Sequence, residues 1–192
     1  MIEQSFSPVL ELTRGDTIES IHCGAIAVVS PRGEMLHSYG DPYTVTFLRS
    51  AAKPFQVMPF IEAGGHRHYH LTQEEIALMC ASHSGTDEHF RVLSGLQAKT
   101  GVAEGDLMCG VHTPYDKATA DELIRRGEEP TANRHNCSGK HTGMLAYARM
   151  NGEDLPTYLE TGHPIQTRIL NCLSEMSGAT LGYEASVIGE DR

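Results

Sequence analysis

Residues 43–65 read YTVTFLRSAAKPFQVMPFIEAGG and mark the change from strand-forming to helix-forming sequence. Tyr43 to Leu48 alternates β-forming residues and predicts a strand. The stretch from Ser50 to Ala63 predicts a helix, and Gly64-Gly65 is a typical helix end. A chain that begins with strands and continues with helices favours an α+β fold over alternating β-α-β units.

The first forty residues contain the other predicted strands. Pro8 to Thr13 is short and extended, and a turn signal follows it at Gly15-Asp16. Ile21 to Val29 is rich in β-branched and small residues, and Met35 to Tyr39 forms the next strand. The link Ser30 to Gly33 holds Pro and Gly where a tight reversal needs them, which predicts a β-hairpin.

Capping residues predict the later helices. Thr72 and Glu75 form a capping box, Thr86 opens the following helix, and Gly101 closes it. Three more helices are expected at Asp116–Arg126, Cys137–Met150 and Pro164–Met176.

The predicted organisation of residues 1–192 is a single incomplete domain. N-terminal strands occupy about 6–48, a mainly helical lobe occupies about 50–178, and a returning strand lies near 183–189.

Charge and length exclude several classes of protein. The chain has 192 residues, with 15 Lys+Arg against 25 Asp+Glu and a net charge of −10. This acidic balance argues against binding to nucleic acid or to an anionic membrane. No secretory signal and no long apolar run is visible, and the five cysteines form no C-x-x-C pair. Reduced thiols in a cytoplasm are therefore expected.

The tetrapeptide Ser50-Ala51-Ala52-Lys53 is the first candidate for chemistry. A helix that begins here places Ser50 and Lys53 on one face, so the amine can approach the hydroxyl. A lysine in that position can act as general base for a serine nucleophile. The structural alternative is a capping serine followed by a solvated lysine.

The second candidate is the run of Ser82, His83 and Ser84, which follows a predicted helix. Small polar residues at such a transition often present hydroxyls and backbone amides to ligands. The structural alternative is a helix C-cap with Gly85 in the left-handed conformation.

The third candidate is the polar stretch 133–143, which reads NRHNCSGKHTG and contains no large apolar residue. Cys137 at a helix start favours a thiolate, suited to a metal or to nucleophilic chemistry. Lys140 and His141 lie one turn further on. His135 and His141 do not match the spacing of a helical metal pair.

Four sequence motifs together resemble the bacterial L-asparaginase II family of the serine-lysine type. They are RSAAKPFQVMPFIEAGG (49–65), ALMCASHSGTDEHF (77–90), MCGVHTPYD (108–116) and NCSGKHTGMLA (136–146). The resemblance covers nearly the whole chain from about Pro8. It implies a fold similar to serine β-lactamases and glutaminases, in which an antiparallel sheet and a helical lobe meet at the Ser-x-x-Lys motif.

The resemblance also implies roles for particular residues. Ser50 would be the nucleophile, Lys53 its base and Ser82 a second catalytic serine, whereas Cys137 and Lys140 would bind zinc. Four further residues would bind substrate: Arg49, His83, His141 and Asp191.

The same family continues beyond the point that corresponds to Arg192, with closing strands, a further zinc-ligating cysteine and another active-site lysine. This chain is therefore expected to be the N-terminal part of a longer enzyme. The expected reaction is hydrolysis of L-asparagine, a small-molecule substrate, to L-aspartate and ammonia. Neither nucleic acid nor a membrane is an expected partner, and whether the protein forms a homodimer is left open. The alternatives are another serine-lysine acyl hydrolase, of the glutaminase or penicillin-recognising type, and an inactive zinc-binding module.

Overall fold

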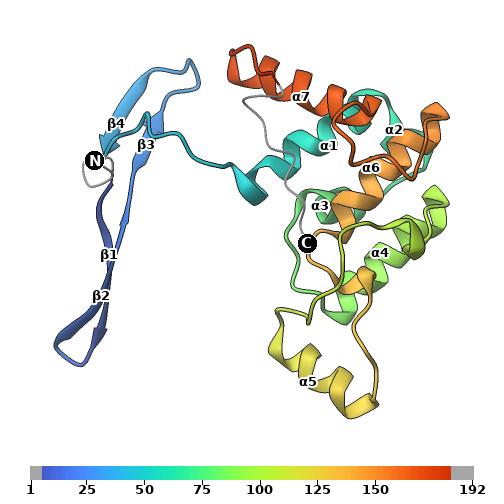
Figure 1. Cartoon of the computed structure of the whole chain (residues 1–192), viewed down its shortest axis with the longest axis horizontal. Helices are drawn as coiled ribbons and strands as arrows, with labels where there is room; N and C mark the ends of the chain where they lie inside the picture. Colours follow the sequence, from blue (N-terminus) through green and yellow to red (C-terminus); the bar gives the residue numbers. More distant parts are fainter. Residues whose placement is uncertain (1–5, 183–192) are drawn as a thin grey trace. The chain divides into compact units, whose positions relative to one another are not determined.

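The computed structural model describes residues 6–182 and divides the chain into a β unit up to Phe47 and a helical unit from Leu48 (Figure 1). Helices and antiparallel strands occur together, as the sequence predicts for an α+β protein. The returning strand expected near 183–189 and the candidate residue Asp191 lie outside the described residues.

The β unit consists of two antiparallel hairpins. The first hairpin turns at Gly15, where φ is 60°, and the second at Ser30–Gly33, where the Gly33 N–H donates to Ser30 O at 2.9 Å. The Tyr39 hydroxyl donates to Pro8 O at 3.0 Å and so links the two hairpins. The strands are β1 (Ser7–Arg14), β2 (Thr17–Gly24), β3 (Ile26–Val29) and β4 (Met35–Tyr39).

Two strand predictions in this unit are wrong in detail. The expected strand Ile21–Val29 is divided at Ala25, because β2 pairs with β1 whereas β3 pairs with β4. Tyr43 to Leu48 forms no strand. Its side chains favour extended backbone, but a strand also needs a neighbour to receive its N–H and C=O groups, and none of the described strands pairs with it.

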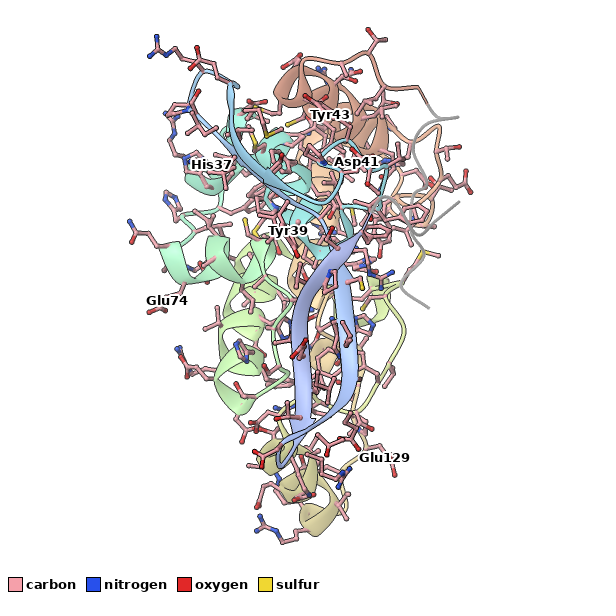
Figure 2. All side chains as sticks on the ribbon, turned by 90° about the vertical axis from the view of Figure 1, so that its left-hand side faces the viewer. His37, Tyr39, Asp41, Tyr43, Glu74 and Glu129 are labelled. Carbon is pink, nitrogen blue, oxygen red and sulfur yellow. The ribbon has the colours of Figure 1, made fainter. Side chains whose placement is uncertain are left out.

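The apolar side chains of the β unit are not buried. None of residues 6–47 belongs to the buried class, and the side chain of Val45 is 97% exposed. Figure 2 shows the strands with their side chains as sticks, including His37 and Tyr39 on β4. Two-stranded hairpins without a buried face are marginally stable, so the hydrophobic core lies in the helical unit.

The helical unit begins and ends its helices where the capping signals predict. Thr72 and Thr86 both form capping boxes, and Gly101 adopts the left-handed conformation with φ 71°. The α-helices are α1 (Lys53–Glu62), α2 (Gly65–His68), α3 (Gln73–Cys80), α4 (Asp87–Thr100), α5 (Lys117–Arg126), α6 (Ser138–Asn151) and α7 (Pro164–Ser177). Short 3-10 turns occupy η1 (Arg49–Ala52), η2 (Glu104–Asp106) and η3 (Ala132–Arg134).

Helix α6 lies at the centre of this unit, in contact with α1, α3, α4 and α7 (Figure 1). Every residue from Ser138 to Ala148 is buried. Two glycines let α3 approach closely. A Cβ at Gly139 would collide with the carbonyl oxygen of Leu78, and one at Gly143 would lie 2.6 Å from Met79 Cε. The contact between α3 and α6 therefore fixes the end of α3, from which the polar loop with Ser82 begins.

None of the helices within residues 6–182 has both the length and the apolar composition that a bilayer span requires.

Candidate active site

Ser50 and Lys53 lie together at the junction of η1 and α1. Lys53 Nζ is 3.2 Å from Ser50 Oγ, as a separation of three residues in a helical turn allows. Ser50 is exposed, whereas Lys53 is only 3% exposed. Arg49, immediately before the serine, has φ 48°, a left-handed conformation that is uncommon for a residue with a side chain. The chain therefore turns sharply and presents the Ser50 hydroxyl above a buried amine.

Ser82 completes a triangle with this pair. Its hydroxyl lies 2.5 Å from Lys53 Nζ and donates to Ser50 Oγ at 2.7 Å. Ser82 reaches this position because α3 ends at Cys80 and the chain continues extended from Ala81. The alternative that Gly85 caps this helix is therefore wrong, although Gly85 does adopt a left-handed conformation with φ 74°.

The surroundings of Lys53 are suited to proton transfer. A buried amine is unfavourable without hydrogen bonds, and both serine hydroxyls provide them. No carboxylate among the described residues forms an ion pair with Lys53. The amine is therefore not held by a carboxylate and lies in reach of two hydroxyl oxygens.

His83 lies beside Ser82 in the sequence, but its ring points into the protein and is only 3% exposed. The Gly85 N–H donates to Nδ1 at 3.2 Å, and Nε2 is 2.9 Å from Ser138 Oγ. Burial, together with the nearby His89, His135, Lys53 and His112, lowers the pKa of His83 from 6.5 to about 4. The imidazole is therefore neutral near pH 7.

This neutral state predicts a loss of stability in acid. A histidine whose pKa is lowered by folding binds its proton more tightly in the unfolded chain, so its contribution is complete above about pH 6.5 and is lost as pH falls toward 4. Between pH 7.5 and 5 we expect the wild type to lose about 2 kcal/mol more of its free energy of unfolding than His83→Gln. Denaturant unfolding of both proteins measures this difference. Equal pH dependence of the two proteins would contradict it.

His141 is a buried residue of α6. It is 2% exposed, and its Nδ1 is 2.6 Å from the hydroxyl of Tyr158. The Tyr158 hydroxyl accepts a bond from the Met108 N–H at 2.9 Å, so its own proton is available for His141. Burial raises the pKa of Tyr158, which keeps the phenol protonated as a donor.

Cys137 and Lys140 lie together at the start of α6. Cys137 is its N-cap residue, and the Cys137 N–H donates to His135 Nδ1 at 3.1 Å. Both side chains are buried. Within residues 6–182 no group of three or more His, Cys, Asp and Glu side chains gathers as metal ligands. Because a structural zinc site needs four ligands, the described residues do not complete one.

No sequence pattern identifies Arg134 as a site residue, yet it anchors the loop that carries Ser82. Its guanidinium donates to Gly85 O at 2.9 Å and to Asp87 Oδ1 at 2.6 Å, and it lies 4.6 Å from the centre of the Phe90 ring. The bond from Arg134 lowers the pKa of Asp87. The polar stretch 133–143 includes Arg134, but no local signal pairs it with an acidic residue 47 positions away.

The chain was also compared with known proteins. A family model described as L-asparaginase II matches residues 10–189, which is nearly the whole chain. No curated protein matches it.

Proposed function

The chain belongs to the L-asparaginase II family, and from this premise we propose that it hydrolyses L-asparagine to L-aspartate and ammonia with Ser50 as nucleophile. The observation that carries the mechanism is the triangle of Ser50, Lys53 and Ser82, with 2.5–3.2 Å between its polar atoms. A serine hydroxyl becomes an effective nucleophile when an adjacent base takes its proton.

In the first step Ser50 Oγ attacks the side-chain amide carbon of the substrate. Its proton passes to the amine of Lys53, which is the base in this proposal, either directly over 3.2 Å or through the hydroxyl of Ser82. The C–N bond then breaks, and the leaving nitrogen takes that proton and departs as ammonia. The product of the step is an aspartyl ester on Ser50.

In the second step a water molecule attacks the ester. Lys53 accepts the proton of the water and returns a proton to Ser50 Oγ as the ester bond breaks. L-Aspartate leaves, and the Ser50 hydroxyl and the Lys53 amine return to their starting states. The two serines are exposed, so both substrate and water can reach the triangle from solvent.

We assign substrate binding to Arg49, Asp191 and His141, as the resemblance implies. Arg49 precedes the nucleophile directly, and a guanidinium suits the α-carboxylate of an amino acid. His141 remains in the proposal through the resemblance, although its contact with Tyr158 places it in the core.

Cys137 and Lys140 remain the proposed zinc-binding pair. No chemical step of the reaction runs through a metal, because Ser50, Lys53 and Ser82 account for every proton that moves.

A fold similar to serine β-lactamases also belongs to the proposal. It is supported by antiparallel hairpins that precede a helical unit and by a Ser-x-x-Lys motif at the start of that unit. A cytoplasmic location is part of the same proposal and is based on the sequence.

Ammonia release from L-asparagine, with L-glutamine in parallel, tests the function. We expect faster release from L-asparagine and, after acid quenching, an aspartyl group on the peptide that contains Ser50. An equal or greater rate with L-glutamine would favour a glutaminase. Ammonia release with the acyl group on another residue would contradict Ser50 as nucleophile.

A further inference from the structure

His83 uses both ring nitrogens in bonds to protein groups. Ser138 Oγ donates its single proton to Asn133 O at 3.2 Å, so the 2.9 Å contact with His83 must be a bond from the Nε2–H to the serine. Nδ1 accepts the Gly85 N–H. A ring with both nitrogens occupied and 3% exposure has no atom left for a substrate.

The backbone of His83 makes a third connection in the same direction. Its N–H donates to Asn136 O at 3.2 Å. His83 is thus bonded through its backbone to Asn136 and through its ring to Ser138, at the start of α6.

We infer that His83 is a positioning residue, which clamps the 81–85 loop to the start of α6 and so holds the Ser82 hydroxyl against Lys53. Its importance for turnover rests on the proposed function, whereas the clamp itself does not. This role differs from the substrate contact that the resemblance implies for His83.

The neutral form of the ring suits the clamp. A protonated imidazole would carry an N–H at Nδ1 and point it at the Gly85 N–H, which would remove one bond and add a repulsion. The ring also stacks on His89 with 5.1 Å between centroids, inside a group of imidazoles that disfavours a positive charge. The neutral form, which can hold the loop, is therefore also the form that the surroundings favour.

His163 offers a matched control within the same unit. It is 5% exposed, its Nδ1 accepts the Ile165 N–H at 3.2 Å, and its Nε2 donates to Asp154 O at 2.8 Å. It therefore repeats the local bonding of His83, but it caps α7, which carries none of the proposed site residues. His163→Gln should lose stability much as His83→Gln does, with turnover unchanged.

The experiment compares His83→Gln, Ser138→Ala, their double variant and His163→Gln. For His83→Gln we expect kcat for L-asparagine to fall about 10- to 100-fold with KM changed less than about twofold, since a hydroxyl displaced by about 1 Å loses turnover and not binding. Ser138→Ala leaves the ring in place and removes its acceptor, together with the serine's own bond to Asn133 O, so it should lower kcat in the same direction. The double variant should be no worse than the lower single variant.

Hydrogen exchange of backbone amides tests the clamp independently of enzymatic turnover. Amides of the 81–85 loop should exchange faster in His83→Gln and Ser138→Ala than in the wild type and His163→Gln. Unchanged exchange of these amides in His83→Gln would overturn the clamp. A raised KM at constant kcat in His83→Gln would also overturn it, and so would a change in kcat no larger than that in His163→Gln. A wild type that releases no ammonia but shows the expected exchange pattern would contradict the proposed function and support the clamp.

Discussion

Replacement of Ser50 by alanine is expected to lower ammonia release from L-asparagine by on the order of 10⁴-fold or more. Without the hydroxyl no aspartyl ester can form, and the remaining groups can only assist direct attack by water. The fold should be unaffected, because Ser50 is exposed and its side chain bonds only to Lys53 and Ser82 among the described residues. A coupled ammonia assay gives the rate, and thermal unfolding gives the stability.

Ser177→Ala is the matched control for this variant. Ser177 is also exposed, and it lies at the end of α7, where its hydroxyl donates to Ser174 O. Its replacement should leave turnover within about twofold, because a surface substitution away from the site changes little. Turnover by Ser50→Ala at the rate of this control would show that another residue forms the acyl-enzyme.

Replacement of Lys53 by methionine is expected to lower kcat by about 10²- to 10⁴-fold, the range that a general base contributes. Methionine is an unbranched apolar side chain of nearly the same length and lacks the amine. Because the position is 3% exposed, an apolar residue is better suited to it, and the free energy of unfolding should stay the same or rise. A variant that is stable and inactive separates the catalytic role of the lysine from a structural one.

Two further lysine variants make the experiment decisive. Lys53→Arg places a permanent positive charge at this position but cannot serve as a base at neutral pH, so it should not recover the activity. Lys117→Met removes an exposed lysine that pairs with Asp121 on α5, and it should retain full turnover. Activity in Lys53→Arg near the wild-type rate would mean that the charge, and not proton transfer, is what the site requires.

The sequence predicts the helical unit well because its signals are local. Thr72, Thr86 and Gly101 act within one turn of the helix ends that they mark, and the structure confirms all three. Strands are different, since Tyr43 to Leu48 has suitable residues and still pairs with no described strand. The break at Ala25 likewise depends on which strand pairs with which, and residue type alone does not decide this.

The candidate site likewise combines a local contact, which the sequence predicts, with contacts between distant residues, which it does not predict. The proximity of Ser50 and Lys53 follows from a separation of three residues in a helical turn. Ser82 lies 32 residues from Ser50, so only the family resemblance could connect them. The bonds of His83 to Ser138 and of Arg134 to Asp87 span 55 and 47 residues, and no local pattern contains them.

The close contact between α3 and α6 has a consequence for attempts to engineer this protein. Alanine is the usual replacement for a helical glycine when a more heat-resistant enzyme is wanted. At Gly139 the added methyl group would meet the carbonyl of Leu78 and push α3 outward, and Ser82 follows the end of that helix by two residues. Alanine at Gly139 would raise the helix propensity of α6 but would also displace the Ser82 hydroxyl. Substitutions meant to raise thermal stability should therefore begin at positions outside the contact between α3 and α6.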